Sequence, residues 1–136
     1  MSEMDEMVKM LSDAPEEQRK SMLTQRLKML AGQPEEQLVK SLAGLITAVN
    51  NLKPKKMKPF IATRTKVIMG MDKDDAEKLL TARLKAAKVV EDQVHKTDFM
   101  TTMEVAKEMG EEKFKMFSGM IKLIAEKHGM PLPKFD

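Results

Sequence analysis

Three arginines occupy the same position of a repeating pattern, and each is followed two residues later by a lysine. They are Arg26, Arg64 and Arg83. If these positions line up on neighbouring helices, their guanidinium groups form a row that could bind phosphates or carboxylates through paired hydrogen bonds. The alternative interpretation is structural: the arginine stems cover the margin of the core, and the charged ends pair with acidic residues at the starts of neighbouring helices. The sequence leaves both interpretations open.

A second group of cations lies just ahead of Phe60. Lys53, Lys55, Lys56 and Lys58 form the densest basic run of the chain, and such a run could contact nucleic-acid phosphates without regard to base sequence. Apart from Phe60, no aromatic residue lies among or beside these lysines, and no helix-turn-helix or RNP-like signature accompanies them. Binding of nucleic acid or another polyanion is therefore an alternative function, beside the simpler interpretation of a solvated loop.

Methionine is abundant, with 15 among 136 residues. Thioethers can bind Cu(I), but the chain has no Cys and only two His, so we predict no metal site and no cofactor. Methionine more often fills irregular cores or supplies a deformable surface for partner helices. A hydrophobic interface is predicted at Met4, Met7 and Met10, which follow a three-residue step. A second cluster comprises Met100, Met103, Met109, Met116 and Met120.

No group of residues has the spacing that catalysis requires. His95 and His128 are far apart, and neither has a neighbour at metal-ligand spacing. The acidic stretch from Asp72 to Asp75 lacks the glycine and the distal Glu of a calcium loop, so helix capping explains it better. There is no Ser/His/Asp set and no glycine-rich phosphate loop. We predict that the protein is not an enzyme.

A 19-residue repeat indicates the elements that position these residues. Pro15-Glu16-Glu17-Gln18 returns as Pro34-Glu35-Glu36-Gln37, and one apolar register contains Leu23, Leu42, Ile61 and Leu80. Nineteen residues is not a whole number of helical turns, so the repeat indicates a helix and a short turn, copied several times. The apolar registers are clearest over residues 4–90 and fade beyond them.

Apolar spacing and helix-breaking residues predict the boundaries. Asp13 is expected to cap the second helix, with Pro15 in its first turn. Gly32, Asn51 and Gly70 can adopt positive φ and are expected to end three helices. No segment alternates with the period of a strand, so no sheet is predicted. The predicted helices span residues 2–12, 14–31, 34–50, 55–69, 72–92, 98–109 and 111–128.

These helices predict an all-α fold. Turns of three or four residues favour antiparallel neighbours, so about seven short antiparallel helices are expected to form a helical bundle or a small α-solenoid. We expect one all-helical domain over residues 1–129, in which residues 98–129 form a C-terminal helical hairpin. Residues 130–136 contain two prolines and are expected to form an extended tail.

Composition is that of a globular chain, with 42% hydrophobic and 33% charged residues and a net charge of +3. No apolar stretch approaches the roughly 20 residues that span a bilayer, and the start lacks a signal-peptide pattern, so we expect a cytoplasmic protein with no membrane partner. We predict a helical-repeat interaction module, an adaptor or accessory subunit, whose Met- and Leu-rich groove binds a protein partner or a second copy. The alternatives are nucleic-acid or polyanion binding and the carriage of an apolar ligand between helices.

Overall fold

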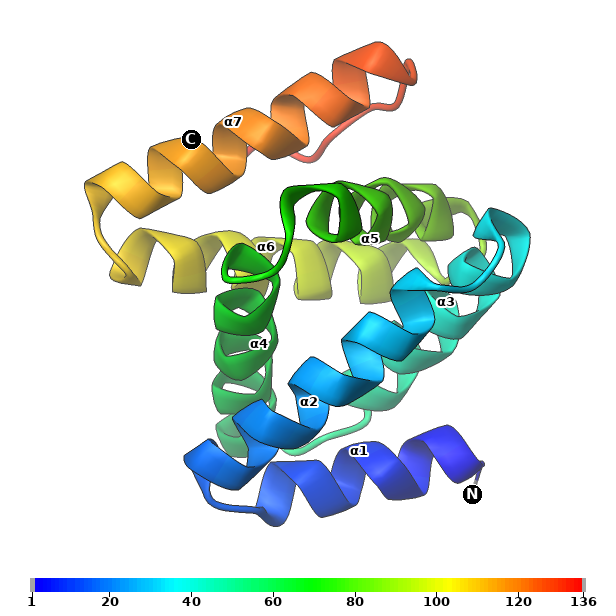
Figure 1. The fold of residues 1–136 in the computed structure, drawn as a ribbon, viewed down its shortest axis with the longest axis vertical. Helices are drawn as coiled ribbons and strands as arrows, with labels where there is room; N and C mark the ends of the chain where they lie inside the picture. Colours follow the sequence, from blue (N-terminus) through cyan, green and yellow to red (C-terminus); the bar gives the residue numbers. More distant parts are fainter. Residues whose placement is uncertain (1, 136) are drawn as a thin grey trace.

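A computed structural model describes residues 2–135, and over that range the chain forms seven α-helices and no strand (Figure 1). This confirms the predicted all-α class. Met1 and Asp136, the ends of the predicted domain and tail, lie outside the described residues. The helices are α1 (Glu3–Asp13), α2 (Glu16–Ala31), α3 (Glu35–Asn50), α4 (Pro54–Met69), α5 (Lys73–Lys85), α6 (Asp92–Glu108) and α7 (Glu111–Lys127), and a 3-10 turn, η1 (Ala86–Lys88), follows α5.

The helix starts repeat at a constant interval. From α3 to α7, each helix begins 19 residues after the one before it. The residue that precedes each of α2 to α6 has an extended backbone; φ and ψ are −58° and 150° at Pro15, and −58° and 148° at Pro34. A proline ring fixes φ near this value, so the repeated proline redirects the chain at the same point of two corners. The interval persists after residue 90, where the apolar registers fade.

Two details of the predicted corners are wrong. Asp13 is the last residue of α1, and Pro15 is the residue that precedes α2, where no side chain caps the helix start. Gly32, Asn51 and Gly70 do follow the ends of three helices, but their φ angles are −80°, −83° and −94°. No left-handed residue is needed there, because the extended residue before the next helix makes the turn.

The boundary between α5 and α6 also differs from the prediction of one helix to about residue 92 and the next from residue 98. The sequence predicts a longer α5 because Ala87 and Val90 continue its apolar spacing. In the structure α5 ends at Lys85, η1 follows, and α6 begins at Asp92. Val90 still packs against buried residues of the core from outside a helix, so its apolar character does not require helical backbone. The C-terminal helix pair thus begins at residue 92 and not at residue 98.

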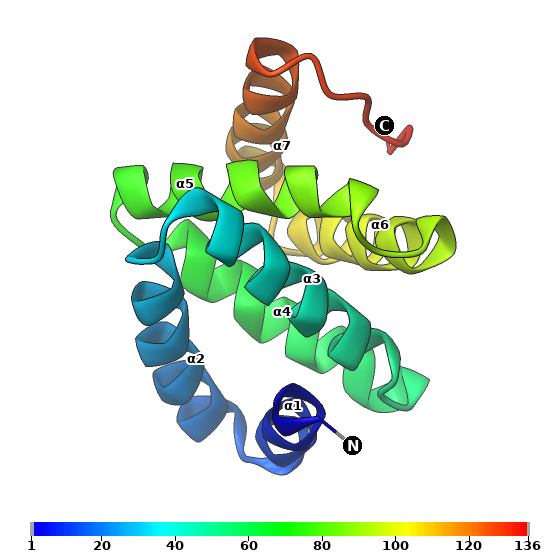
Figure 2. The same ribbon diagram turned by 90° about the vertical axis from the view of Figure 1, so that its right-hand side faces the viewer.

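Helices two positions apart in the chain pack most closely. α1 lies against α3, α2 against α4, α3 against α5, α4 against α6 and α5 against α7, whereas consecutive helices from α1 to α4 contact one another less. α6 and α7 are consecutive and also pack closely. The result is a helical bundle in which α1 and α7 lie at opposite ends of the long axis, as both views show (Figures 1 and 2).

Two clusters of buried side chains account for most of the core. One lies mainly among α1 to α4, and the other among α5 to α7. Ile68 on α4 packs against both clusters and so connects them. The predicted apolar register is buried in every copy, which confirms it: Leu23, Leu42, Ile61 and Leu80.

The segment that follows α7 is extended over residues 130–135 and folds back against the helices (Figure 2). Phe135 is buried there, with its ring centre 5.5 Å from that of Phe99 and 6.4 Å from that of Phe114. The ammonium group of Lys122 lies 5.1 Å from the centre of the Phe135 ring. Within the described residues, no helix has the length and apolar character needed to cross a bilayer.

Candidate functional site

A hollow lined with methionines lies between α1 and α2. The two helices meet at a corner where Ala14 and Pro15 are both extended, as is usual for a proline and the residue before it, and they diverge from that corner (Figure 1). The hollow has a volume of about 280 Å³. We name it the methionine hollow; its lining residues are Met7, Met10, Leu11, Met22, Gln25, Arg26 and Met29.

Two of these methionines project into solvent. Met10 is 54% exposed and Met29 is 64% exposed, while Met7 and Met22 are partly buried and pack on the core beneath. Large apolar side chains that are exposed together mark candidate interaction sites on protein surfaces. Because methionine side chains are unbranched and flexible, such a surface can adapt to apolar partners of different shape.

The predicted interface residues divide between this hollow and the core. Met7 and Met10 line the hollow, whereas Met4 is partly buried and packs against the core cluster of α1 to α4. Met22 and Met29 are absent from the predicted interface. The sequence does carry a signal for them, because a spacing of seven residues places both on one face of α2.

Arg26 supplies a positive charge to the hollow. It is exposed on α2 between Met22 and Met29, and none of the ion pairs formed by the described residues includes it. A guanidinium group in this position can bind a carboxylate through two parallel hydrogen bonds. The hollow therefore offers apolar contact together with a binding group for an acidic side chain.

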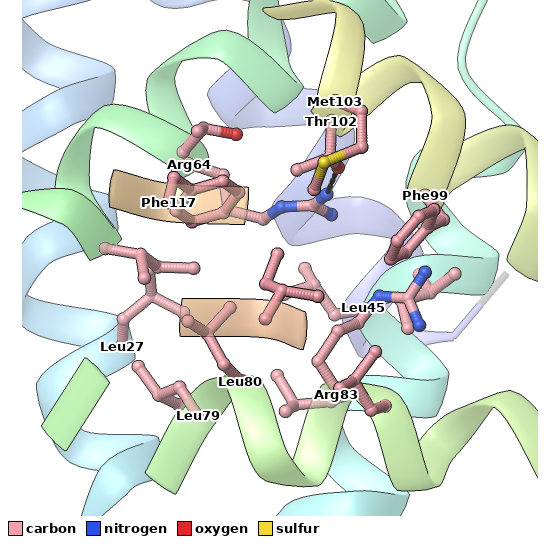
Figure 3. A pocket seen from close by; sticks show the side chains of 16 residues that line it. Leu27, Leu45, Arg64, Leu79, Leu80, Arg83, Phe99, Thr102, Met103 and Phe117 are labelled. Atoms are coloured by element: carbon pink, nitrogen blue, oxygen red, sulfur yellow. Dashed lines mark hydrogen bonds between the residues drawn. The ribbon is translucent and has the colours of Figure 1, made fainter. Parts of the chain in front are cut away.

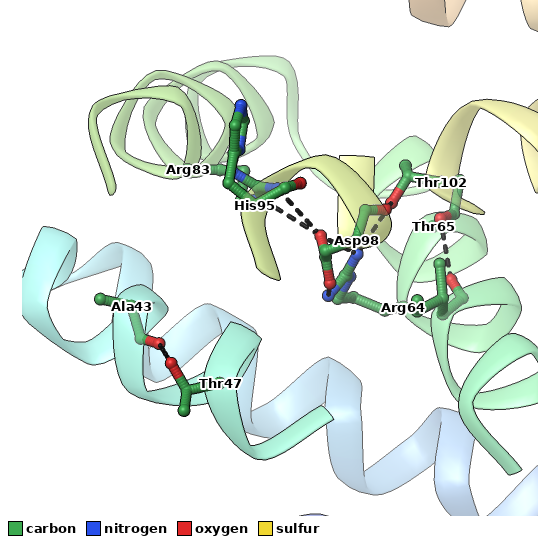
Figure 4. A network of polar contacts seen from close by, with 9 residues as sticks. Ala43, Thr47, Arg64, Thr65, Arg83, His95, Asp98 and Thr102 are labelled. Carbon is green, nitrogen blue, oxygen red and sulfur yellow. Dashed lines mark hydrogen bonds and ion pairs between the residues drawn. The ribbon is translucent and has the colours of Figure 1, made fainter. Parts of the chain in front are cut away.

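The other two arginines of the predicted row lie inside the protein (Figure 4). Arg64 on α4 donates from Nη1 to Oδ2 of Asp98 at 2.9 Å and from Nη2 to Oδ1 at 3.0 Å. Nη2 also donates to the hydroxyl of Thr102 at 2.9 Å. Arg83 on α5 donates to Oδ1 of the same carboxylate, from Nε at 3.2 Å and from Nη2 at 3.1 Å. We name Arg64, Arg83 and Asp98 the buried ion cluster, since the Asp98 side chain is only 3% exposed.

His95 lies on the other side of Arg83. Nη1 of Arg83 is 3.0 Å from Nδ1 of His95, and because a guanidinium group can only donate, Nδ1 accepts and carries no proton. Burial, and then the charge of Arg83, lowers the pKa of His95 below its ordinary value. Burial by itself would raise the pKa of Asp98, but the charges of Arg64 and Arg83 bring it below the usual range. Asp98 is therefore charged and His95 neutral at pH 7.

The three arginines consequently do not form a row. Arg26 is on the outer surface of α2, whereas Arg64 and Arg83 converge on Asp98 in the interior. Arg64 and Arg83 do pair with an acidic residue, as the structural interpretation expected, but their side chains are largely buried and not at the core margin, and their partner lies within α6 and not at a helix start. Sequence reasoning missed Asp98. The one local signal for Asp98 in the sequence is Thr102, which follows it by one helical turn and so lies on the same face of the helix. In the structure the Thr102 hydroxyl accepts a hydrogen bond from Arg64.

Carboxylates interrupt the predicted basic patch. Lys56 and Lys58 form ion pairs with acidic residues of α1 and α6, at distances of 2.6 to 3.3 Å. Lys53 and Lys55 are exposed, and with Lys56 they line a surface hollow that also contains two aspartates. The lysines do lie at the surface, but neighbouring negative charge reduces the potential that would attract a phosphate chain.

A small, largely enclosed space lies at the centre of the bundle (Figure 3). Its volume is about 50 Å³, and carbon atoms form almost all of its wall, including the stems of Arg64 and Arg83. Such a space holds a few water-sized molecules, whereas ligand sites usually measure about 300 Å³ or more. This internal space is too small for the apolar ligand that the sequence analysis gave as an alternative. Among the described residues, no group of three or more His, Asp or Glu side chains could hold a metal ion.

Comparison of the chain with protein-family models, with curated protein sequences and with solved structures gives no match. The choice of a functional site therefore depends on the geometry of this chain alone. The side chains of the buried ion cluster are at most 14% exposed, and no buried side-chain N or O atom in the described part of the chain lacks a hydrogen-bond partner. The methionine hollow is open and combines exposed apolar groups with an unpaired cation. It is the stronger candidate.

Proposed function

We propose that this protein is a non-enzymatic interaction module that binds an amphipathic helix of a partner protein in the methionine hollow. The observation that carries the proposal is the joint exposure of Met10 and Met29 at the hollow. Covering these side chains is favourable, by about 25 cal/mol for each Å² of apolar surface removed from water. We further propose that the protein works in the cytoplasm as an adaptor or accessory subunit.

The arrangement of the hollow favours a helix as its ligand. Met22 and Met29 are about two turns apart on one face of α2, and Met7 and Met10 line the hollow from α1. Helix-in-groove recognition uses apolar residues at positions i, i+3 or i+4, and i+7. A helix with this spacing places its apolar side chains among the methionines, and an acidic residue at its edge pairs with Arg26.

The alternative functions have less support. A polyanion site would need several accessible cations on one surface, but Arg64 and Arg83 are bound to Asp98, and Lys56 and Lys58 have acidic partners. An apolar-ligand carrier would need an internal space several times larger than the one at the centre of the bundle.

A peptide selection tests the proposed function. A phage-displayed library of helical peptides with variable apolar and charged positions is screened against the wild-type protein. The selected peptides should carry apolar residues at i, i+3 or i+4, and i+7, with an acidic residue beside them. The double variant Met10→Glu, Met29→Glu should bind these peptides at least about tenfold more weakly, equivalent to about 1.4 kcal/mol, because two charges then replace apolar contact.

Two further variants serve as controls for this selection. Val89→Glu is the matched control, since Val89 is 60% exposed but does not line the hollow; it should bind the peptides as the wild type does. Arg26→Gln should keep the apolar preference and lose the preference for an acidic residue. Circular dichroism checks that each variant retains its helices. If no peptide is selected, or if the double variant binds as well as Val89→Glu, the proposed function is wrong.

A further inference from the structure

A stripe of exposed residues runs along the outer face of α7. Met116 is 58% exposed and Leu123 is 67% exposed, and Gly119 lies between them at the surface. Steps of four and three residues place Glu112 and Glu126 on the same face, one at each end. Both glutamates are exposed, and neither takes part in an ion pair of the described residues. We name these five residues the α7 stripe.

The fold of a single chain does not require glycine at position 119. A Cβ atom on Gly119 would meet nothing within 4 Å, and its φ is not positive. Glycine in the interior of a helix is destabilising relative to alanine. A glycine at this position allows another chain to approach the helix closely, because glycine has no side chain that would separate the two surfaces.

The α7 stripe matches one wall of the methionine hollow in spacing. Met116 and Leu123 are seven residues apart, as are Met22 and Met29 on α2. Both pairs therefore extend about 10.5 Å along their helices. When the two rows lie side by side, each exposed apolar side chain of the stripe can contact a methionine of the hollow.

The two surfaces are also complementary in side-chain size and in charge. Between its two methionines α2 presents the long side chain of Arg26, and the corresponding place in the α7 stripe is the glycine, which leaves room for it. Lys20, Arg26 and Lys28 are exposed on α2, and no ion pair within the described part of the chain uses them. The stripe ends in the two glutamates. Charges of opposite sign speed the encounter of two surfaces and set their register.

We infer that the methionine hollow of one copy receives the α7 stripe of a second copy. This inference rests on the function proposed above and identifies the partner at the same site. α1 and α2 begin at one end of the bundle and α7 lies at the other (Figures 1 and 2), so the contact is head to tail. Each added copy leaves one hollow and one stripe free, and the protein associates into open chains, or into rings where the rotation closes.

Sedimentation velocity on the full chain tests this inference. The wild type should associate as its concentration rises to about 1 mM, at which a contact worth about −4 kcal/mol is half formed. The hollow variant (Met10→Glu, Met29→Glu) and the stripe variant (Met116→Glu, Leu123→Glu) should each remain monomeric. An equimolar mixture of these two variants should form a one-to-one dimer and nothing larger, because the mixture contains one intact hollow and one intact stripe per pair.

A third variant separates close packing from charge. Gly119→Leu adds an apolar side chain into open space, so the single chain should fold as before. It should nevertheless weaken association at least about tenfold, because the added side chain keeps the two helices apart. Val89→Glu again serves as the control and should assemble as the wild type does.

The outcomes distinguish this inference from the proposed function. The stripe variant keeps an intact hollow, so it should still bind the selected peptides. A wild-type protein that stays monomeric at about 1 mM, or a variant mixture that forms no dimer, overturns the inference, whereas peptide binding by that same protein would continue to support the proposed function. Association that the stripe variant and Gly119→Leu leave unchanged also overturns it, because the partner surface would then lie outside α7.

Discussion

At the scale of single residues, the carboxylate of Asp98 joins arginines from two other helices. Two guanidinium groups and one carboxylate leave a net positive charge in an apolar interior. Ions withdrawn from water persist only where hydrogen bonds replace their hydration. Asp98 accepts from both arginines, and Thr102 accepts from Arg64. This bonding holds α4, α5 and α6 together beneath the surface.

Removing the charge of Asp98 should destabilise the fold strongly. Asp98→Asn leaves two buried guanidinium groups without a counter-ion, and losing one partner of a buried ion pair costs about 3 to 5 kcal/mol. Urea unfolding followed by circular dichroism measures the change. Asp92→Asn, on the same helix but in an exposed pair with Lys96, is the matched control and should cost no more than about 1 kcal/mol. Equal stability of the two variants would contradict this account of the cluster.

The protonation of His95 predicts a pH dependence of stability. Its pKa is lowered in the folded protein, first by burial and then by Arg83, whereas the unfolded chain takes up the proton near the ordinary value of 6.5. The unfolded state thus binds more protons below that pH, so the free energy of unfolding should fall as the pH falls. Protonation of Nδ1 would also set two donors, Arg83 and His95, against each other.

The variant His95→Gln isolates this effect. It removes the titrating group while Oε1 of glutamine can still accept from Arg83. The loss of unfolding free energy between about pH 7 and pH 5.5 should therefore be smaller in the variant than in the parent. Chemical denaturation at a series of pH values gives both slopes. Parallel slopes would mean that His95 does not titrate in this way.

The chemistry of single residues was predictable only in part. Pairing of Arg64 and Arg83 with an acidic residue agrees with the structural interpretation, but their side chains lie inside the bundle and not at the margin of the core. Their partner was not predictable, since Asp98 is 34 and 15 residues away from them in the chain. Local spacing carries no information on pairs that only the packing of helices brings together.

At the scale of elements, the repeated corner organises the chain. Helices of about 16 residues start at a 19-residue interval because an extended residue precedes each of α2 to α6. The sequence predicted this interval from its Pro-Glu-Glu-Gln repeats. It did not predict the end of α5, because apolar spacing continues through Ala87 and Val90, and a buried apolar residue looks the same in a helix and in the turn after it.

Two glycines in different backbone conformations should respond in opposite ways to alanine. Gly44 lies exposed within α3 with open space around it, so Gly44→Ala should raise the free energy of unfolding by about 0.5 to 1 kcal/mol. Gly110 has a φ of 113°, which alanine adopts only with strain, so Gly110→Ala should lower it by about 1 to 3 kcal/mol. Urea unfolding measures both changes. A stabilising Gly110→Ala would show that the corner before α7 can be rebuilt without glycine.

At the scale of the whole molecule, the helices pack mainly against helices two positions away in the chain, so α1 and α2 diverge from each other. α1 packs against α3 and α2 against α4, so α1 and α2 are held by different partners and do not close on each other. Met10 and Met29 are exposed as a result. The bundle also places α7 at the end remote from α1 (Figure 1), and this polarity is what makes the inferred association head to tail.

The helical class, the 19-residue interval and the buried register of Leu23, Leu42, Ile61 and Leu80 could be predicted from the amino-acid sequence, because these depend on local backbone preferences and on apolar periodicity. The sequence also indicated Met7 and Met10 as candidate interface residues, and both line the methionine hollow. The packing partners of each helix, the carboxylate that Arg64 and Arg83 share, and the exposure of Arg26 without an ion-pair partner became evident from the folded chain. Those facts depend on contacts between residues far apart in the chain, and such contacts form only once every helix has buried its apolar face against a particular neighbour.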